Sequence, residues 1–118
     1  MSLTIYHNPK CSTARNVLES LRAAGHEPVV VDYIKTPLDA ATLTRLADKM
    51  AQPHDLLRTK EPLYKSLELH ADLTPQAIVE ALVAHPILLN RPICETDSFA
   101  MAVRPSAAVT IFLEHIAP

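Results

Sequence analysis

Residues 3–32 read LTIYHNPKCSTARNVLESLRAAGHEPVVVD, and this stretch contains the pattern that decides the fold. Leu3–Tyr6 is typical of a short strand. An amphipathic helix is expected from about Ser12 to Ala24, with Gly25 at its C-terminal cap. The apolar residues of Pro28–Asp32 predict a second, fully buried strand without alternation. Strand, helix and strand together form a βαβ unit, whose crossover should be right-handed.

The rest of the chain is predicted to be helical first and then extended. Helices are expected to begin at Thr36-Pro37 and Thr74-Pro75, with shorter helical pieces around His54–Thr59 and Glu61–Leu67. Two extended segments are expected next, Ile93–Thr96 and Ala100–Val103, joined at Asp97-Ser98 and followed by a closing helix over Ser106–Ile116. The order βαβ, helices, ββα predicts an α/β, thioredoxin-like mixed sheet with a helical insertion over about residues 36–85.

Composition excludes several classes of protein. The chain has 118 residues, which suits one domain over residues 1–118, and it has a single glycine, so Walker and dinucleotide-binding loops are excluded. A net charge of −2 gives no reason to expect nucleic acid or a membrane surface as partner. No secretory signal is visible after Met1, so we expect a cytoplasmic protein, and we expect it to be a monomer.

The loop before the first predicted helix has the residues of an anion site. Cys11 falls at the helix N-terminus, where backbone N–H groups and the helix dipole favour a thiolate or a bound oxyanion. Such positions lower a cysteine pKa from about 8.5 to roughly 3.5–7.5. Positive charge can come from His7, Lys10 and Arg15, and the hydroxyl groups of Ser12 and Thr13 can hydrogen-bond an anion. The alternative is a small buried cysteine at a helix start.

The sequence has two cysteines, and they have different expected roles. Cys11-Ser12-Thr13-Ala14 is not a Cys-x-x-Cys motif, so an oxidised Cys11 must be resolved by another thiol. Cys94 falls in a strand expected to be central, and we favour a buried core residue over a resolving thiol. The resolving role would require Cα atoms within about 7 Å of each other. The six histidines show no metal-ligand spacing, so no metal site is predicted.

Three arginines stand out by their context. Arg58 falls in the helical region, whereas Arg91 enters the predicted final hairpin and Arg104 leaves it. A guanidinium group binds tetrahedral oxyanions well, because its planar fork donates to two oxygens at once. For any one arginine, the alternative is an ordinary solvated surface charge.

Four segments resemble the motifs of the glutaredoxin-coupled, ArsC-type arsenate reductases, which belong to the thioredoxin-like superfamily. They are His7-Asn8-Pro9-x-Cys11-Ser12-x-x-Arg15, Leu56-Leu57-Arg58 with Glu61-Pro62-Leu63-Tyr64, residues 85–93 (HPILLNRPI), and Arg104-Pro105-Ser106. The resemblance covers nearly the whole chain in the family's order and spacing.

The resemblance implies a role for each matched position. Cys11 would be the nucleophile that attacks arsenate, and His7 would help to keep it a thiolate. The oxyanion would be bound by Arg58, Arg91 and Arg104, and Pro92 would be the cis-proline that faces the Cys11 loop. Glutathione would act as co-substrate, with no bound cofactor, and glutaredoxin would complete the cycle and release arsenite.

Two other functions are consistent with the same residues. One is a glutathione-dependent thiol–disulfide oxidoreductase of this family without physiological arsenate activity. It is favoured if the three arginines point away from Cys11. The other is a regulator similar to the Spx-type proteins, which bind RNA polymerase and typically switch through Cys-x-x-Cys, a motif that Ala14 interrupts here.

Overall fold

The computed structural model describes residues 2–116, and its centre is a mixed four-stranded sheet in the order β2-β1-β3-β4. The strands are β1 (Leu3–His7), β2 (Val29–Asp32), β3 (Ile93–Thr96) and β4 (Ala100–Ala102). β1 pairs in parallel with β2 and antiparallel with β3, and β3 pairs antiparallel with β4. The mixed sheet predicted from the sequence is therefore confirmed.

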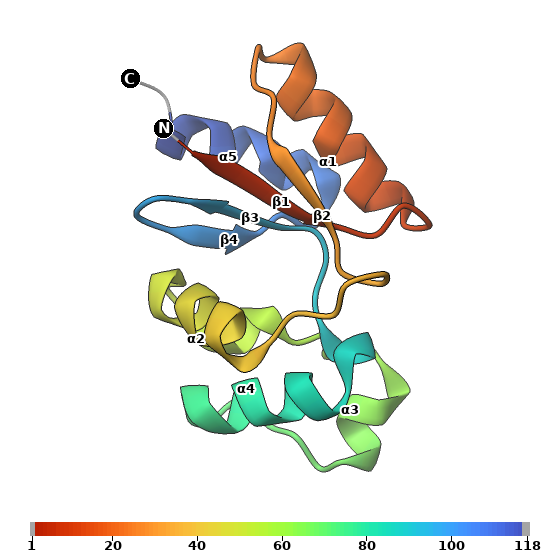
Figure 1. Ribbon diagram of the computed structural model, residues 1–118. Coiled ribbons are helices and arrows are strands. Elements are labelled where there is room, and N and C mark those ends of the chain that lie inside the picture. The colour runs from red at the N-terminus through yellow and green to blue at the C-terminus, as the bar shows by residue number, and fades with distance from the viewer. Residues whose placement is uncertain (1, 117–118) are drawn as a thin grey trace.

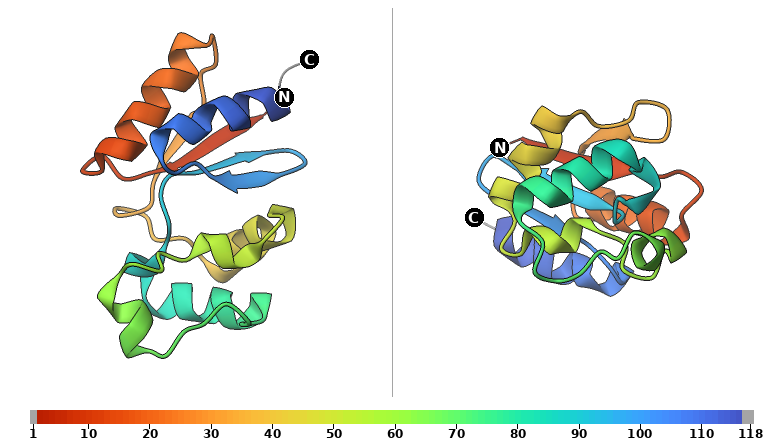
Figure 2. Two further views of the ribbon diagram at one scale, coloured as in Figure 1. Left: turned by 180° about the vertical axis from the view of Figure 1, so that it is seen from behind. Right: turned by 90° about the horizontal axis from the view of Figure 1, so that it is seen from below.

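Helices lie on both sides of this sheet (Figure 1). One side carries α1 (Ser12–Ala23) and α5 (Val109–Ile116). The other carries the inserted helices α2 (Ala40–Lys49), α3 (Pro62–Ser66) and α4 (Pro75–Ala84). Single 3-10 turns are formed by Pro53–Leu56, Pro86–Leu88 and Ser106–Ala108. The view from behind shows the same two helical layers with the sheet between them (Figure 2).

The alternation of side chains along the strands produces one hydrophobic core on each side of the sheet. On β1, Ile5 packs into the core shared with α1 and α5, whereas Tyr6 packs into the core shared with α2 and α4. On β3, Cys94 belongs to the first core and Ile93 to the second. Each face of the central strands therefore anchors a different helical layer.

The prediction of a fully buried second strand is wrong. Within residues 2–116, β2 is an edge strand that pairs only with β1, and Val29 and Val30 are 62% and 40% exposed. A run of apolar residues cannot distinguish a central strand from an edge strand, because burial depends on the neighbours that the topology supplies.

Two helix starts also differ from the prediction. The helix expected at Thr36 begins at Ala40, because Asp39 accepts a hydrogen bond from the Thr42 backbone N–H at 2.8 Å and acts as the N-cap. The closing segment begins as a 3-10 turn at Ser106 and becomes α-helical at Val109. By contrast, the Thr74 cap of α4 is confirmed by its 3.1 Å hydrogen bond to the Ala77 N–H.

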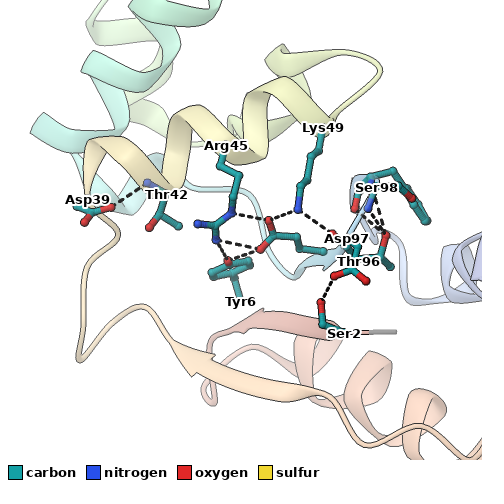
Figure 3. Close-up of polar contacts among 11 residues, drawn as sticks. Ser2, Tyr6, Asp39, Thr42, Arg45, Lys49, Thr96, Asp97 and Ser98 are labelled. Atoms are coloured by element: carbon teal, nitrogen blue, oxygen red, sulfur yellow. Dashed lines mark hydrogen bonds and ion pairs between the residues drawn. The ribbon is translucent and has the colours of Figure 1, made fainter.

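A buried polar cluster connects α2 to the centre of the sheet (Figure 3). Glu95 on β3 is 6% exposed and accepts hydrogen bonds from Tyr6 at 2.6 Å, Arg45 at 2.7 and 3.1 Å, and Lys49 at 2.9 Å. Lys49 also donates to the Thr96 carbonyl at 2.8 Å. These bonds fix the first inserted helix against the sheet.

Candidate functional site

Cys11 lies at the N-terminus of α1, in a loop held by its own backbone. The Cys11 N–H donates to the Asn8 carbonyl at 3.0 Å, which closes a turn with Pro9 at its second position. Asn8 Oδ1 also accepts a hydrogen bond from the Lys10 N–H at 3.0 Å. Asparagine at the first and proline at the second position are favoured in such turns. The Cys11 carbonyl then accepts from Arg15 N–H at 3.0 Å and starts the helix.

The final hairpin brings two arginines together beside this cysteine. Ile93 is opposite Ala102, and the Val103 N–H donates to the Pro92 carbonyl at 3.0 Å, so the register places Arg91 opposite Arg104. Arg104 Nη1 lies 3.0 Å from the Arg91 carbonyl oxygen and 3.6 Å from Cys11 Sγ. The Arg91–Pro92 and Arg104–Pro105 peptide bonds are both cis.

A third arginine is brought to the site by a short pairing of distant segments. Leu57 forms an antiparallel bridge with Leu89. The Arg58 N–H donates to the Leu88 carbonyl at 2.8 Å. The Arg58 guanidinium pairs with Glu61 at 3.2 Å. Burial lowers the pKa of Arg58, and the charges of Arg91 and Arg104 lower it further against the opposing effect of Glu61. The charge of Arg58 is thus exposed to those of Arg91 and Arg104.

The surroundings of Cys11 favour its charged form. Burial acts to raise the pKa of the thiol, but the backbone N–H of Ala14 and the guanidinium groups of Arg104 and Arg91 outweigh it. The pKa of Cys11 is therefore lowered from its ordinary value. The side chain is also partly accessible, which a nucleophile requires.

An open pocket of about 400 Å³ is lined by Arg104, which contacts Cys11, although Cys11 itself is not among the lining residues. Among the described residues, its walls are formed by Thr13, Leu57, Arg58, Thr59, Lys60, Asn90, Arg104 and Pro105. Three of these side chains are cationic and none is acidic. The pocket therefore offers an anion several donors next to a thiol whose charged form is favoured.

A model described as the ArsC family matches residues 6–112. The chain belongs to the ArsC family. It is 40% identical over 110 residues to the arsenate reductase of Escherichia coli strain K12, covering 92% of this chain and 78% of that protein. It is 44% identical over 108 residues to YfgD of the same strain, named an uncharacterized protein, covering 89% and 91% of the two chains.

A solved structure agrees with this membership. The arsenate reductase from Vibrio cholerae superposes with a TM-score of 0.81 at 37% identity, covering 94% of this chain and 97% of that one. The ArsC-family chain is therefore arsenate-reductase-like in both sequence and fold.

In this ArsC-family protein, His7 lies at the end of β1 and is buried. Burial lowers its pKa, and Arg15 and Arg22 lower it further against the opposing effect of Asp32. The imidazole is therefore mainly neutral at pH 7 and supplies little positive charge. Within residues 2–116, its Nδ1 atom has no hydrogen-bond partner.

The other predicted loop residues have different surroundings. Thr13 lines the pocket, whereas Ser12 is exposed and is not among the lining residues. Arg15 donates to the Pro9 carbonyl at 2.9 Å and so braces the loop that presents Cys11.

Cys94 is the core residue that the sequence favours. It is fully buried on β3, in the core shared with α1 and α5, and burial raises the pKa of its thiol to about 12. An un-ionised, inaccessible thiol is a poor nucleophile, so these properties oppose a resolving role.

Sequence reasoning missed several residues at this site. Tyr33 is buried, and its pKa is raised by burial while Arg91 and Asn8 act against that rise. It follows β2, which is parallel to β1, so both strands lead to the same edge of the sheet. Its position directly after a strand parallel to β1 is therefore the signal that could have placed Tyr33 near the Cys11 loop. Lys60 lines the pocket without any motif that would identify it, whereas Asn90 lies in the segment 85–93, where the resemblance to the family implies no role for it.

The described part of the chain holds no group of three or more His, Cys, Asp or Glu residues placed to share a metal ion. Nor does any helix within residues 2–116 have the length and apolar character needed to cross a bilayer.

Proposed function

We propose that this protein reduces arsenate to arsenite, with Cys11 as the nucleophile and Arg58, Arg91 and Arg104 as the oxyanion-binding groups. The observation that carries the proposal is the 3.6 Å contact between Arg104 Nη1 and Cys11 Sγ at the N-terminus of α1. It places a fork of N–H donors beside a thiol with a lowered pKa. Donors that are already in place can stabilise the negative charge on the oxygens of a tetrahedral substrate.

The first half of the reaction forms the bond between the enzyme and arsenic. The Cys11 thiolate attacks As(V), and one arsenate oxygen leaves as water. A glutathione thiol then condenses with the adduct, and a second oxygen leaves as water. Arsenic is still As(V) at this stage and is bonded to both sulfurs.

The second half transfers the electrons. A glutaredoxin thiolate attacks the glutathione sulfur and forms a mixed disulfide, while the electron pair of the broken S–As bond stays on arsenic. Arsenic becomes As(III), and water hydrolyses the Cys11–S–As bond to release arsenite and restore the thiol. In sum, arsenate and two thiols give arsenite, one disulfide and water. Ala14 supplies no local thiol, which suits this use of external ones.

The test is a coupled assay with arsenate, glutathione and glutaredoxin in which arsenite is measured directly. Wild type should produce arsenite, Cys11→Ser should not, and Cys94→Ala, with its fold checked by circular dichroism, should remain active. If wild type produces no arsenite while Cys11 still reacts with glutathione disulfide, the proposal fails. The protein is then a glutathione-dependent thiol–disulfide oxidoreductase.

The proposed role of the arginines is tested by comparing arsenate turnover with alkylation of Cys11 in the same variant. Removing one donor to a developing oxyanion typically costs about 10²–10³ in rate. We expect a loss of this order in arsenate turnover for Arg91→Ala, with a much smaller effect on alkylation of Cys11 by a neutral reagent. Arg22→Ala is the matched control, since Arg22 pairs with the exposed Glu27. Equal losses in turnover and alkylation would assign Arg91 a structural role only.

A further inference from the structure

The pocket beside Cys11 is larger than an oxyanion requires. Arsenate has five non-hydrogen atoms, which take up about 150 Å³ if each occupies the ~30 Å³ of a liquid water molecule. The pocket measures about 400 Å³, within the range of sites for ligands of several functional groups. The remaining space suits part of a second ligand.

The pocket is lined by Arg104, which contacts Cys11, and also by a segment far from it in sequence. Arg104 marks the cysteine side, since its Nη1 lies 3.6 Å from Sγ. Thr59 and Lys60 contribute the other wall, from the segment that leads into α3. Arg58 directly precedes Thr59 in sequence, and its side chain is held by Glu61 at 3.2 Å and by the Ile87 carbonyl at 3.2 Å.

Lys60 is a cation with no evident role in stabilising the fold. Its side chain is exposed, and the structure records no hydrogen bond or ion pair from it within residues 2–116. The neighbouring Glu61 is already paired with Arg58. Because the described lining residues include no carboxylate, the electrostatics of this wall favour an anionic group of a ligand.

We propose that Lys60 forms a second anion subsite that binds a carboxylate of the thiol co-substrate and so directs the thiol sulfur toward Cys11. This inference rests on the proposed use of glutathione, which carries two carboxylates and one thiol. Lys60 is a specificity-determining residue for the thiol and does not bind the arsenate oxygens. A neutral thiol or disulfide of similar reactivity gains nothing from it.

The experiment uses no arsenate, so its result is independent of arsenate turnover. The Cys11 thiolate attacks one sulfur of glutathione disulfide, forming the Cys11–glutathione disulfide and releasing one glutathione thiolate. The rate is followed by intact-protein mass spectrometry and compared with the rate toward bis(2-hydroxyethyl) disulfide, which is neutral. The variants are Lys60→Gln, Lys60→Arg and, as matched control, Lys65→Gln, since Lys65 is exposed on α3 and absent from the lining.

Lys60→Gln should slow the reaction with glutathione disulfide about fivefold, which corresponds to the free energy of a partly exposed ion pair. Its rate with the neutral disulfide should stay within about twofold of the wild-type rate. Lys60→Arg should restore most of the rate, and Lys65→Gln should match wild type. The inference is overturned if Lys60→Gln slows the reaction equally with both disulfides or slows neither. It is also overturned if Lys65→Gln shows the same loss of rate with glutathione disulfide. None of these results alters the test of arsenate reduction.

Discussion

Replacement of Glu95 by glutamine should destabilise the protein by removing the charge that holds α2 to the sheet. Burial acts to raise the pKa of Glu95, but hydrogen bonds from Arg45, Tyr6 and Lys49 outweigh it and lower the pKa from 4.5 to about 2. That difference corresponds to about 3 kcal/mol of unfolding free energy at neutral pH. Arg45 and Lys49 are 50% and 21% exposed, so both cations can turn to water once the carboxylate is gone.

The stabilisation by Glu95 depends on pH, and the direction of that dependence follows from the pKa shift. The folded-state pKa lies below the unfolded one, so the stabilisation is complete above about pH 5 and is lost as pH falls toward 2. Urea denaturation followed by circular dichroism should show Glu95→Gln about 3 kcal/mol less stable than wild type at neutral pH, with the gap narrowing toward pH 3. The melting temperature should fall by about 10 °C.

The matched control is Glu27→Gln. Glu27 pairs with Arg22 at 3.2 Å, but its side chain is 73% exposed, so the variant should lose at most about 1 kcal/mol. A loss of less than about 1 kcal/mol in Glu95→Gln at neutral pH would refute the reasoning. A difference in unfolding free energy between Glu95→Gln and wild type that stays constant from neutral to acid pH would also refute it.

Three further predictions concern single residues. Arg104→Ala should raise the pKa of Cys11 and slow its alkylation at neutral pH; an unchanged pH profile would contradict the contact at 3.6 Å. Cys94 should resist alkylation in the native protein and react only after unfolding, because it is buried and its pKa is raised to about 12; native labelling would contradict its burial. Gly25→Ala should cost about 1 kcal/mol in thermal or urea denaturation, since Gly25 has φ of +91°. Apart from Gly25 and its two chain neighbours, no atom of residues 2–116 lies within 4 Å of the added Cβ, so an unchanged stability would exclude backbone strain.

The sequence predicts local structure well where the signal is local. The start of α1 after Cys11, the cap at Thr74 and the reversal after Thr96 depend on neighbouring residues, and the structure places all three as expected. β2 shows the opposite case. Its valines have the composition of a buried strand, yet their exposure is set by strand order, which depends on contacts between distant segments.

The residues of the site can likewise be divided into those that have a local sequence signal and those that do not. Cys11 can be identified from its own loop, and the sequence indicates that Arg91 enters the final hairpin and Arg104 leaves it. The strand register then sets the two arginines opposite each other. The pairing of Leu57 with Leu89, which brings Arg58 to the pocket, joins segments far apart in the chain and has no local signature. The Glu95 cluster is hidden for a similar reason, because its partners come from β1 and α2.

Alkylation of Cys11 by a neutral reagent, measured across pH with and without arsenate, tests the proposed chemistry most directly. Wild type should show a thiol pKa below the ordinary value of about 8.5, and arsenate should slow the reaction by occupying the arginine site. That protection should be much weaker in Arg91→Ala. An ordinary pKa together with alkylation that saturating arsenate leaves unchanged would contradict a Cys11 thiolate poised to attack a bound oxyanion.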